Sequence, residues 1–176
     1  GGLGASPISS LGAGFAKVEE SQPVLVDIVH VHRGYVSDCT RMFCAGNLPE
    51  EWSSRLNDMV ELGNEVVSSL GRGDDCSSAW EIGSSMAAEM GHADHLMGIA
   101  PDQASFLGHS VGLELDETPV VARGFDRALT VGGIMAIEPK VIHFEGAIGT
   151  EDTWVRTNEG MECLTAGEDF PLVSEW

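Results

Sequence analysis

A chain of 176 residues is long enough for one domain with a sizeable core, so we treat residues 1–176 as a single domain. The formal net charge of −19 argues against nucleic acid as a partner, because nucleic-acid binding needs basic patches. No apolar run approaches the roughly 18 residues of a membrane span, so we expect no membrane partner either. The 4 cysteines form no CxxC pair and are typical of a reducing compartment such as the cytoplasm.

The first half of the chain predicts a loop, a hairpin and two helices. Residues 1–16 are rich in Gly, Ser and Ala and are expected to form a loop. A β-hairpin is predicted over residues 23–44. A helix should follow, with Pro49 at its first position and Gly71 at its end, because apolar residues recur between them at helical spacing. A second helix is predicted over residues 76–90. Helices between strands indicate an α+β domain whose helices pack on one face of a sheet.

The predicted hairpin carries Asp27 in VLVDIV and Asp38 in YVSDCTR, eleven residues apart. Residues that face each other across a hairpin closed by a two-residue loop differ by an odd number and share one face of the sheet. We therefore expect the two carboxylates to lie directly opposite one another. The midpoint between them puts the turn at His32 and Arg33, with Gly34 just past it.

The second half repeats this plan. Glu138 in IMAIEPKV and Glu151 in IGTEDTWV are thirteen residues apart, and the midpoint between them falls between Phe144 and Glu145. We expect a second hairpin with these two carboxylates side by side. Between the two hairpins, His109 lies in the apolar, glycine-spaced stretch SFLGHSVGLELDE, which we assign to a strand.

These five side chains form an oxygen-rich set suited to two divalent ions of Mn, Co, Zn or Fe. An acid near a hairpin turn is more often a solvated strand residue than a ligand, and a lone histidine is usually a hydrogen-bonded core residue. Here Asp27 and Glu138 each follow a run of apolar residues, where an unpaired carboxylate is costly to bury. Carboxylates about 5 Å apart also repel unless a proton or a cation lies between them.

Four segments resemble the pita-bread metallopeptidases, the family of methionine aminopeptidase, aminopeptidase P and prolidase. They are VLVDIVHVHRGYVSDCTR, FLGHSVGLELDE, GGIMAIEPKV and GTEDTWVRTNEGMECLT, and GYVSDCTR and GHSVGLE point to the Xaa-Pro peptidase branch. The resemblance implies a creatinase/aminopeptidase-like fold, with a curved antiparallel sheet and helices on its outer face. It also implies removal of an N-terminal residue from a peptide substrate. The implied ligands of two metal ions are Asp27, Asp38, His109, Glu138 and Glu151, with Glu138 also carrying the proton from water to the leaving amine.

The chain departs from the family pattern at two histidines that contact the substrate. The one expected seven residues after His109 is replaced by Asp116, which we therefore place with Glu138 among the catalytic-site residues. The other is expected upstream of Asp27, where SPISSLGAG contains no histidine. The chain also begins shortly before the first aspartate strand. We therefore expect the C-terminal part of a longer protein that lacks part of the first half of the fold, with a homodimer as one way to cover the exposed surface.

Two rival functions remain open at this point. The first is a non-catalytic pita-bread protein that keeps the metal ligands and uses the fold for binding, which the replaced histidines favour. The second is a creatinase-like hydrolase that acts on a non-peptide C–N bond without a metal. Retention of all five ligand types argues against the second rival.

Overall fold

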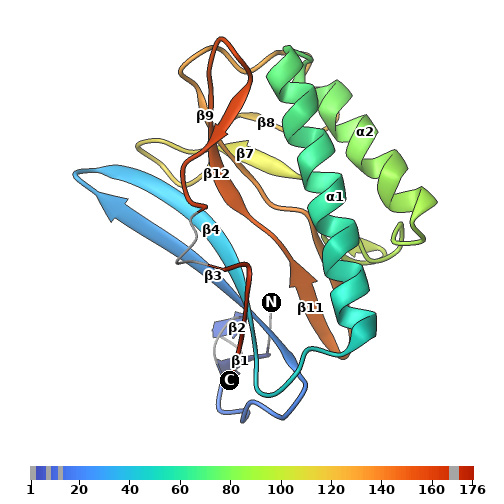
Figure 1. The fold of residues 1–176 in the computed structure, drawn as a ribbon. Coiled ribbons are helices and arrows are strands. Elements are labelled where there is room, and N and C mark those ends of the chain that lie inside the picture. Colours follow the sequence, from blue (N-terminus) through green and yellow to red (C-terminus); the bar gives the residue numbers. More distant parts are fainter. Residues whose placement is uncertain (1–2, 7–8, 12–13, 167–170) are drawn as a thin grey trace.

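The computed structural model describes residues 3–6, 9–11, 14–166 and 171–176. Two helices and several small sheets make up this part of the chain. In Figure 1 the long β3–β4 hairpin lies on one side, and α1 and α2 lie next to each other on the other side, with β9 and β12 between them. Among the described residues, no helix is long and apolar enough to cross a membrane.

The largest sheet has five antiparallel strands in the order β13-β12-β9-β7-β8. A second sheet has the order β14-β4-β3, in which β3 and β4 are antiparallel and β14 runs parallel to β4. A backbone bridge between Thr40 and Glu151 joins the two sheets. The strands of the two sheets are β3 (Pro23–His32), β4 (Tyr35–Cys44), β7 (Gly108–Ser110), β8 (Glu117–Val120), β9 (Ile134–Ile137), β12 (Asp152–Arg156), β13 (Met161–Cys163) and β14 (Val173–Glu175).

Three further pairs of strands are antiparallel: β1 (Leu3–Ser6) with β2 (Ser9–Leu11), β5 (Gly98–Ile99) with β6 (Asp102–Gln103), and β10 (Lys140–His143) with β11 (Gly146–Gly149). The prediction of a loop over residues 1–16 is therefore wrong for the segments that form β1 and β2. Short strands rich in Gly and Ser carry no apolar alternation, so the pattern of the sequence does not reveal this pairing. Residues 1–2, 7–8 and 12–13 of that predicted loop lie outside the described residues.

Helix α1 (Glu50–Arg72) begins and ends close to the predicted positions. Pro49 is the residue that precedes the helix rather than its first residue, and Glu50 and Glu51 place negative charge in the first turn. The helix continues through Gly71, so the predicted end there is wrong. It ends instead at Gly73, whose φ of 95° is the left-handed conformation that glycine adopts without strain.

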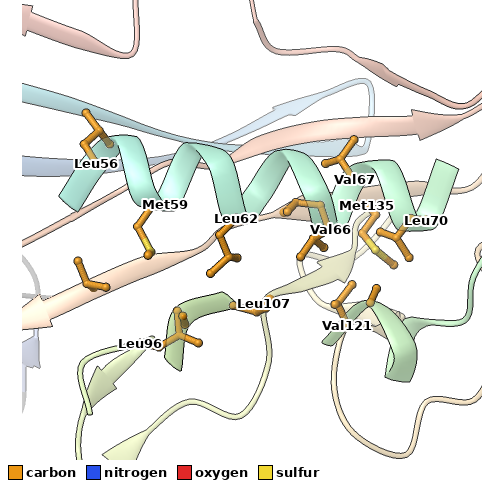
Figure 2. Close-up of a cluster of buried hydrophobic side chains, with 14 of the residues drawn as sticks. Leu56, Met59, Leu62, Val66, Val67, Leu70, Leu96, Leu107, Val121 and Met135 are labelled. Atoms are coloured by element: carbon orange, nitrogen blue, oxygen red, sulfur yellow. The ribbon is translucent and has the colours of Figure 1, made fainter. Parts of the chain in front are cut away.

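The core lies under the inner face of α1. Figure 2 shows Met59, Leu62 and Val66 pointing from this helix toward Leu107 and its neighbours. Helix α2 (Cys76–Glu89) is capped by Asp75, whose side chain accepts a hydrogen bond from the backbone N–H of Ser78. It packs through small residues, because a methyl group at Gly83 would collide with Leu107. The helices thus cover one face and leave the strand residues on the other side to form a site.

Candidate metal centre

The first hairpin turns at Arg33 and Gly34, one residue later than predicted. His32 pairs with Tyr35, and the two turn residues have φ of 51° and 88°. Positive φ at both central residues is the geometry that matches the right-handed twist of a two-stranded hairpin. The later turn changes which residues face each other, because it moves the register of the whole hairpin.

Asp27 is paired with Thr40, and Asp38 with Val29. The prediction that the two aspartates lie directly opposite is therefore wrong, although they share one face of the hairpin as diagonal neighbours. Their environments differ. The side chain of Asp27 is 50% exposed, whereas that of Asp38 is 6% exposed.

The second hairpin has the predicted register. His143 pairs with Gly146, so the turn consists of Phe144 and Glu145. The same register continues on the far side, where Asp152 pairs with Ile137. Glu138 and Glu151 therefore lie opposite one another in the short interruption between the two ladders. Both are buried.

His109 comes to these acids from β7, which pairs with β9. Its Nε2 atom lies 3.3 Å from Glu138 Oε1 and 3.9 Å from Asp38 Oδ2. A side chain at Gly108 would collide with the backbone of β9, so glycine here allows the close approach of the two strands. Asp38, His109, Glu138 and Glu151 thus meet in one buried cluster, and Asp27 borders it from the more exposed side.

Asp116 lies apart from the other acids. Its Oδ1 atom is 3.5 Å from Nδ1 of His109, the ring nitrogen on the opposite side from Glu138. The carboxylate is 73% exposed. It contacts the cluster through the imidazole and not directly.

Lys140 belongs to the cluster and was missed by the sequence prediction. Its Nζ atom donates to Glu138 Oε2 at 2.7 Å and to Glu151 Oε2 at 2.9 Å, and lies 3.5 Å from Asp27 Oδ2. The side chain is 10% exposed. A signal was available, because Lys140 is one of two lysines in the chain and lies two positions after Glu138, a spacing that returns to the same face of an extended strand.

Two neighbours of Asp38 on β4 hold Glu151 in place. The hydroxyl of Thr40 donates to Glu151 Oε2 at 2.6 Å. The guanidinium of Arg41 donates to the backbone carbonyl of Glu151 at 3.0 Å and pairs with Asp152 at 2.7 Å. The segment SDCTR therefore supplies one acid of the cluster and also fixes the position of another.

The crowding of these groups shifts their pKa values. Burial, together with the charges of Glu151 and Asp27, raises the pKa of Asp38 from 3.8 to about 7. Burial lowers the pKa of His109, but the hydrogen bond and charge of Glu138 outweigh it and raise that pKa from 6.5 to about 9. Burial also raises the pKa of Glu151, an effect that Lys140 only partly offsets.

Glu138 behaves in the opposite way from the other acids. Burial raises the pKa of its carboxyl, but the contacts with His109 and Lys140 outweigh burial and hold the pKa below its ordinary value. Glu138 therefore stays ionised at neutral pH. The same carboxylates raise the pKa of Lys140 although burial lowers it, so this side chain remains an ammonium.

Three of the predicted ligands fit a single divalent ion. Asp38, His109 and Glu151 each offer one ligand atom, these atoms lie within 4.8 Å of one another, and all three residues are buried. Asp38 Oδ1 is buried without a hydrogen-bond partner among the described residues, which leaves that oxygen free for a cation. Two carboxylates and an imidazole are ligands that Mn, Fe, Co and Zn accept. Asp27 and Glu138, the other two predicted ligands, contact Lys140, as Glu151 also does.

A cavity of about 310 Å³ lies elsewhere, between α1 and β12. Val60, Val67 and Trp154 are among the side chains that line it, and none of the five predicted ligands does. The candidate metal centre and this cavity are therefore separate sites.

The sequence of residues 6–158 matches metallopeptidase family M24. The chain belongs to this family. A curated relative named Xaa-Pro dipeptidase, from Pyrococcus horikoshii, is 28% identical over 153 residues, which cover 86% of this chain and 42% of the relative. The chain thus spans less than half the length of the curated relatives it matches.

Solved structures agree with the family. The prolidase of Pyrococcus horikoshii is 28% identical, has a TM-score of 0.78, and is matched over 89% of this chain and 43% of its own. The X-Pro aminopeptidase of Thermotoga maritima has a TM-score of 0.82 over 98% of this chain and 46% of its own, and at 20% identity it shows the fold alone. The predicted pita-bread fold and the resemblance to the Xaa-Pro branch are therefore confirmed, for a chain that covers part of each neighbour.

Proposed function

We propose that this chain carries the catalytic site of a metal-dependent peptidase that removes the N-terminal residue from peptides of the Xaa-Pro type. One observation carries the proposal, the meeting of Asp38, His109, Glu138 and Glu151 in one buried cluster of a chain from a metallopeptidase family. The choice of substrate is supported by the relatives, which are named Xaa-Pro dipeptidase and prolidase.

Asp38, His109 and Glu151 would hold a divalent ion, for which Mn, Co, Zn and Fe are the candidates. When bound, such an ion lowers the pKa of a bound water and polarises a carbonyl group. The predicted second ion would need Asp27 and Glu138 as additional ligands. Both of these acids face the ammonium of Lys140, at 3.5 and 2.7 Å.

Glu138 is the residue best placed to move a proton. Its carboxylate stays ionised because His109 and Lys140 hold its pKa below the ordinary value. The same two contacts, at 3.3 and 2.7 Å, fix the orientation of the carboxylate. An ionised and oriented carboxylate beside the ion ligands can accept a proton from water and pass it to the leaving amine.

We expect the turnover to be low. Asp116 replaces a histidine that the family uses for contact with the substrate, and the loss of one such donor typically costs about 10²–10³ in turnover. The exposed carboxylate of Asp116, 3.5 Å from the His109 ring, also brings negative charge close to the site. Slow cleavage of Xaa-Pro peptides is therefore the expected behaviour of the chain.

The test is hydrolysis of Xaa-Pro dipeptides by the purified chain, measured by release of proline. We expect a chelator to abolish the activity and Mn or Co to restore it. Glu138→Gln should lower turnover by about 10²-fold or more, because the proton acceptor is lost. Glu145→Gln, in the turn of the same hairpin and exposed, is the matched control and should retain the wild-type rate. Cleavage that survives both the chelator and Glu138→Gln would contradict the proposal.

The two rival functions have less support. The curated relatives are named as peptidases, which does not favour a non-catalytic binding protein. A buried set of three ion ligands does not favour a hydrolase that works without a metal. The cytoplasmic location and the homodimer stay predictions. The free thiols of all four cysteines agree with the former.

A further inference from the structure

The ammonium of Lys140 lies where a cation would be expected between three carboxylates. It contacts Glu138 at 2.7 Å, Glu151 at 2.9 Å and Asp27 at 3.5 Å. Glu138 is two residues from Lys140, whereas Asp27 lies in β3 and Glu151 follows β11, so the fold brings these two acids to the same ammonium. Two of the three carboxylates are the ones that face each other across the second hairpin.

The surrounding structure is shaped to admit this side chain. Lys140 pairs with Gly149 in the β10–β11 ladder. A methyl group at Gly149 would lie 2.6 Å from Cγ of Lys140 and 2.5 Å from the carbonyl oxygen of Pro139, closer than such contacts allow. The absence of a side chain at Gly149 therefore makes room for the stem of Lys140.

An ammonium and a divalent ion cannot both use these carboxylates at this position. A divalent ion such as Zn would need carboxylate oxygens at roughly 2.0–2.2 Å. In sites with two metals the ions are about 3.5–4 Å apart. The Lys140 ammonium thus occupies the carboxylates that a second ion would need. It also supplies positive charge in place of that ion.

The remaining acid of the cluster is free of Lys140. Asp38 has a buried oxygen without a hydrogen-bond partner among the described residues. Asp38, His109 and Glu151 each offer one ligand atom, and these atoms lie within 4.8 Å of one another. One position in the cluster is therefore filled by a side chain, and a neighbouring position is still open for an ion.

We propose that Lys140 is a built-in cation that replaces one of two metal ions, so that this site binds a single divalent ion through Asp38, His109 and Glu151. The inference rests on the proposed metal site and specifies how many ions it takes. The second ion expected from the family resemblance is excluded by the side chain of Lys140. Glu138 thereby becomes a partner of the ammonium instead of a metal ligand.

The experiment counts ions. Metal-free protein is titrated with Mn²⁺ by calorimetry, and the bound metal is measured by elemental analysis after gel filtration. We expect one ion per wild-type chain and two per chain of Lys140→Met, which removes the ammonium group but keeps an unbranched side chain of nearly the same length. Lys17→Met, at an exposed lysine, is the matched control and should bind one.

Two ions in the wild type, or one ion in Lys140→Met, would overturn the inference and leave the proposed function standing. No ion in any of the three folded proteins would overturn the proposed metal site itself. Should Lys140→Met fail to fold, the electron paramagnetic resonance spectrum of the Mn-loaded wild type still decides. An isolated Mn²⁺ signal at saturation supports one ion, and a spin-coupled pair contradicts it.

Discussion

The two acid-bearing hairpins follow the same plan but differ in how far the rest of the chain encloses them. In the β3–β4 hairpin, Asp27 is half exposed and offset from Asp38. In the β9–β12 region, Glu138 and Glu151 are both buried. The first hairpin is an edge that reaches toward solvent, whereas the second lies between the first hairpin and helix α1 (Figure 1).

This difference explains where a built-in cation is found. Two buried carboxylates that face each other cannot both stay ionised without a positive charge between them. Lys140 supplies that charge from within the second hairpin. The repulsion between Asp27 and Asp38 is weaker, because water can reach Asp27 and because the raised pKa of Asp38, about 7, leaves that carboxyl partly protonated at neutral pH. The enclosed pair thus needs a cation, while the open pair can adjust through solvent and protonation.

Removal of the cation should produce the largest effect. In metal-free protein, Lys140→Met leaves Glu138 and Glu151 buried without their ammonium, and loss of one partner of a buried ion pair typically costs about 3–5 kcal/mol. Asp27→Asn on the open hairpin should cost less than about 1 kcal/mol, because half-exposed ion pairs contribute little. Urea unfolding in the presence of a chelator, followed by tryptophan fluorescence, measures both. Equal losses of unfolding free energy in the two variants would show that the second hairpin depends on a cation no more than the first.

A methyl group at one glycine of each hairpin should give a smaller contrast. At Gly149 the methyl would overlap Lys140 and the backbone of Pro139, and overpacking of this kind costs about 1–3 kcal/mol. At Gly34 there is open space, and the cost is the strain of a positive φ, about 1 kcal/mol. The free energies of unfolding of Gly149→Ala and Gly34→Ala provide the comparison. A smaller loss of unfolding free energy for Gly149→Ala than for Gly34→Ala would mean that the residues around Gly149 can move to accommodate a methyl group.

Much of this site could be predicted from the sequence, and the limits have physical causes. The turn at Phe144 and Glu145 follows from the midpoint of its acids, because both ladders share one register. The first turn was misplaced by one residue, because turn geometry that requires positive φ at both positions decides the register and the spacing of the acids does not.

Lys140 was missed for a different reason. The spacing from Glu138 to Lys140 is visible in the sequence, but the contacts of Lys140 with Asp27 and Glu151 exist only in the folded chain. Contacts that link distant segments in this way are not visible in periodicity. The sequence did indicate that four carboxylates need positive charge, and the prediction assigned that charge to two metal ions and not to a side chain.

The smallest predicted effect concerns the turn end of the second hairpin and its dependence on pH. His143 stacks on His95 with ring centroids 3.9 Å apart and meets the edge of Trp52. Burial and the positive charge of Arg55 hold the pKa of His143 below its ordinary value of 6.5. The folded protein therefore binds fewer protons here than the unfolded chain, so the contribution of His143 to stability is complete above pH 6.5 and is lost as the pH falls through the folded value.

We expect this loss to be measurable against a variant that does not titrate. Between pH 8 and pH 5.5, the urea midpoint of the wild type should fall by more than that of His143→Gln, whose side chain stays neutral throughout. The corresponding variant of the open hairpin, His32→Gln at the exposed end of β3, controls for the removal of a histidine as such. A wild type and a His143→Gln variant that lose stability in parallel would show that the stacked imidazoles can accept a proton at no cost. In that case the enclosure that distinguishes the second hairpin would not extend to its turn.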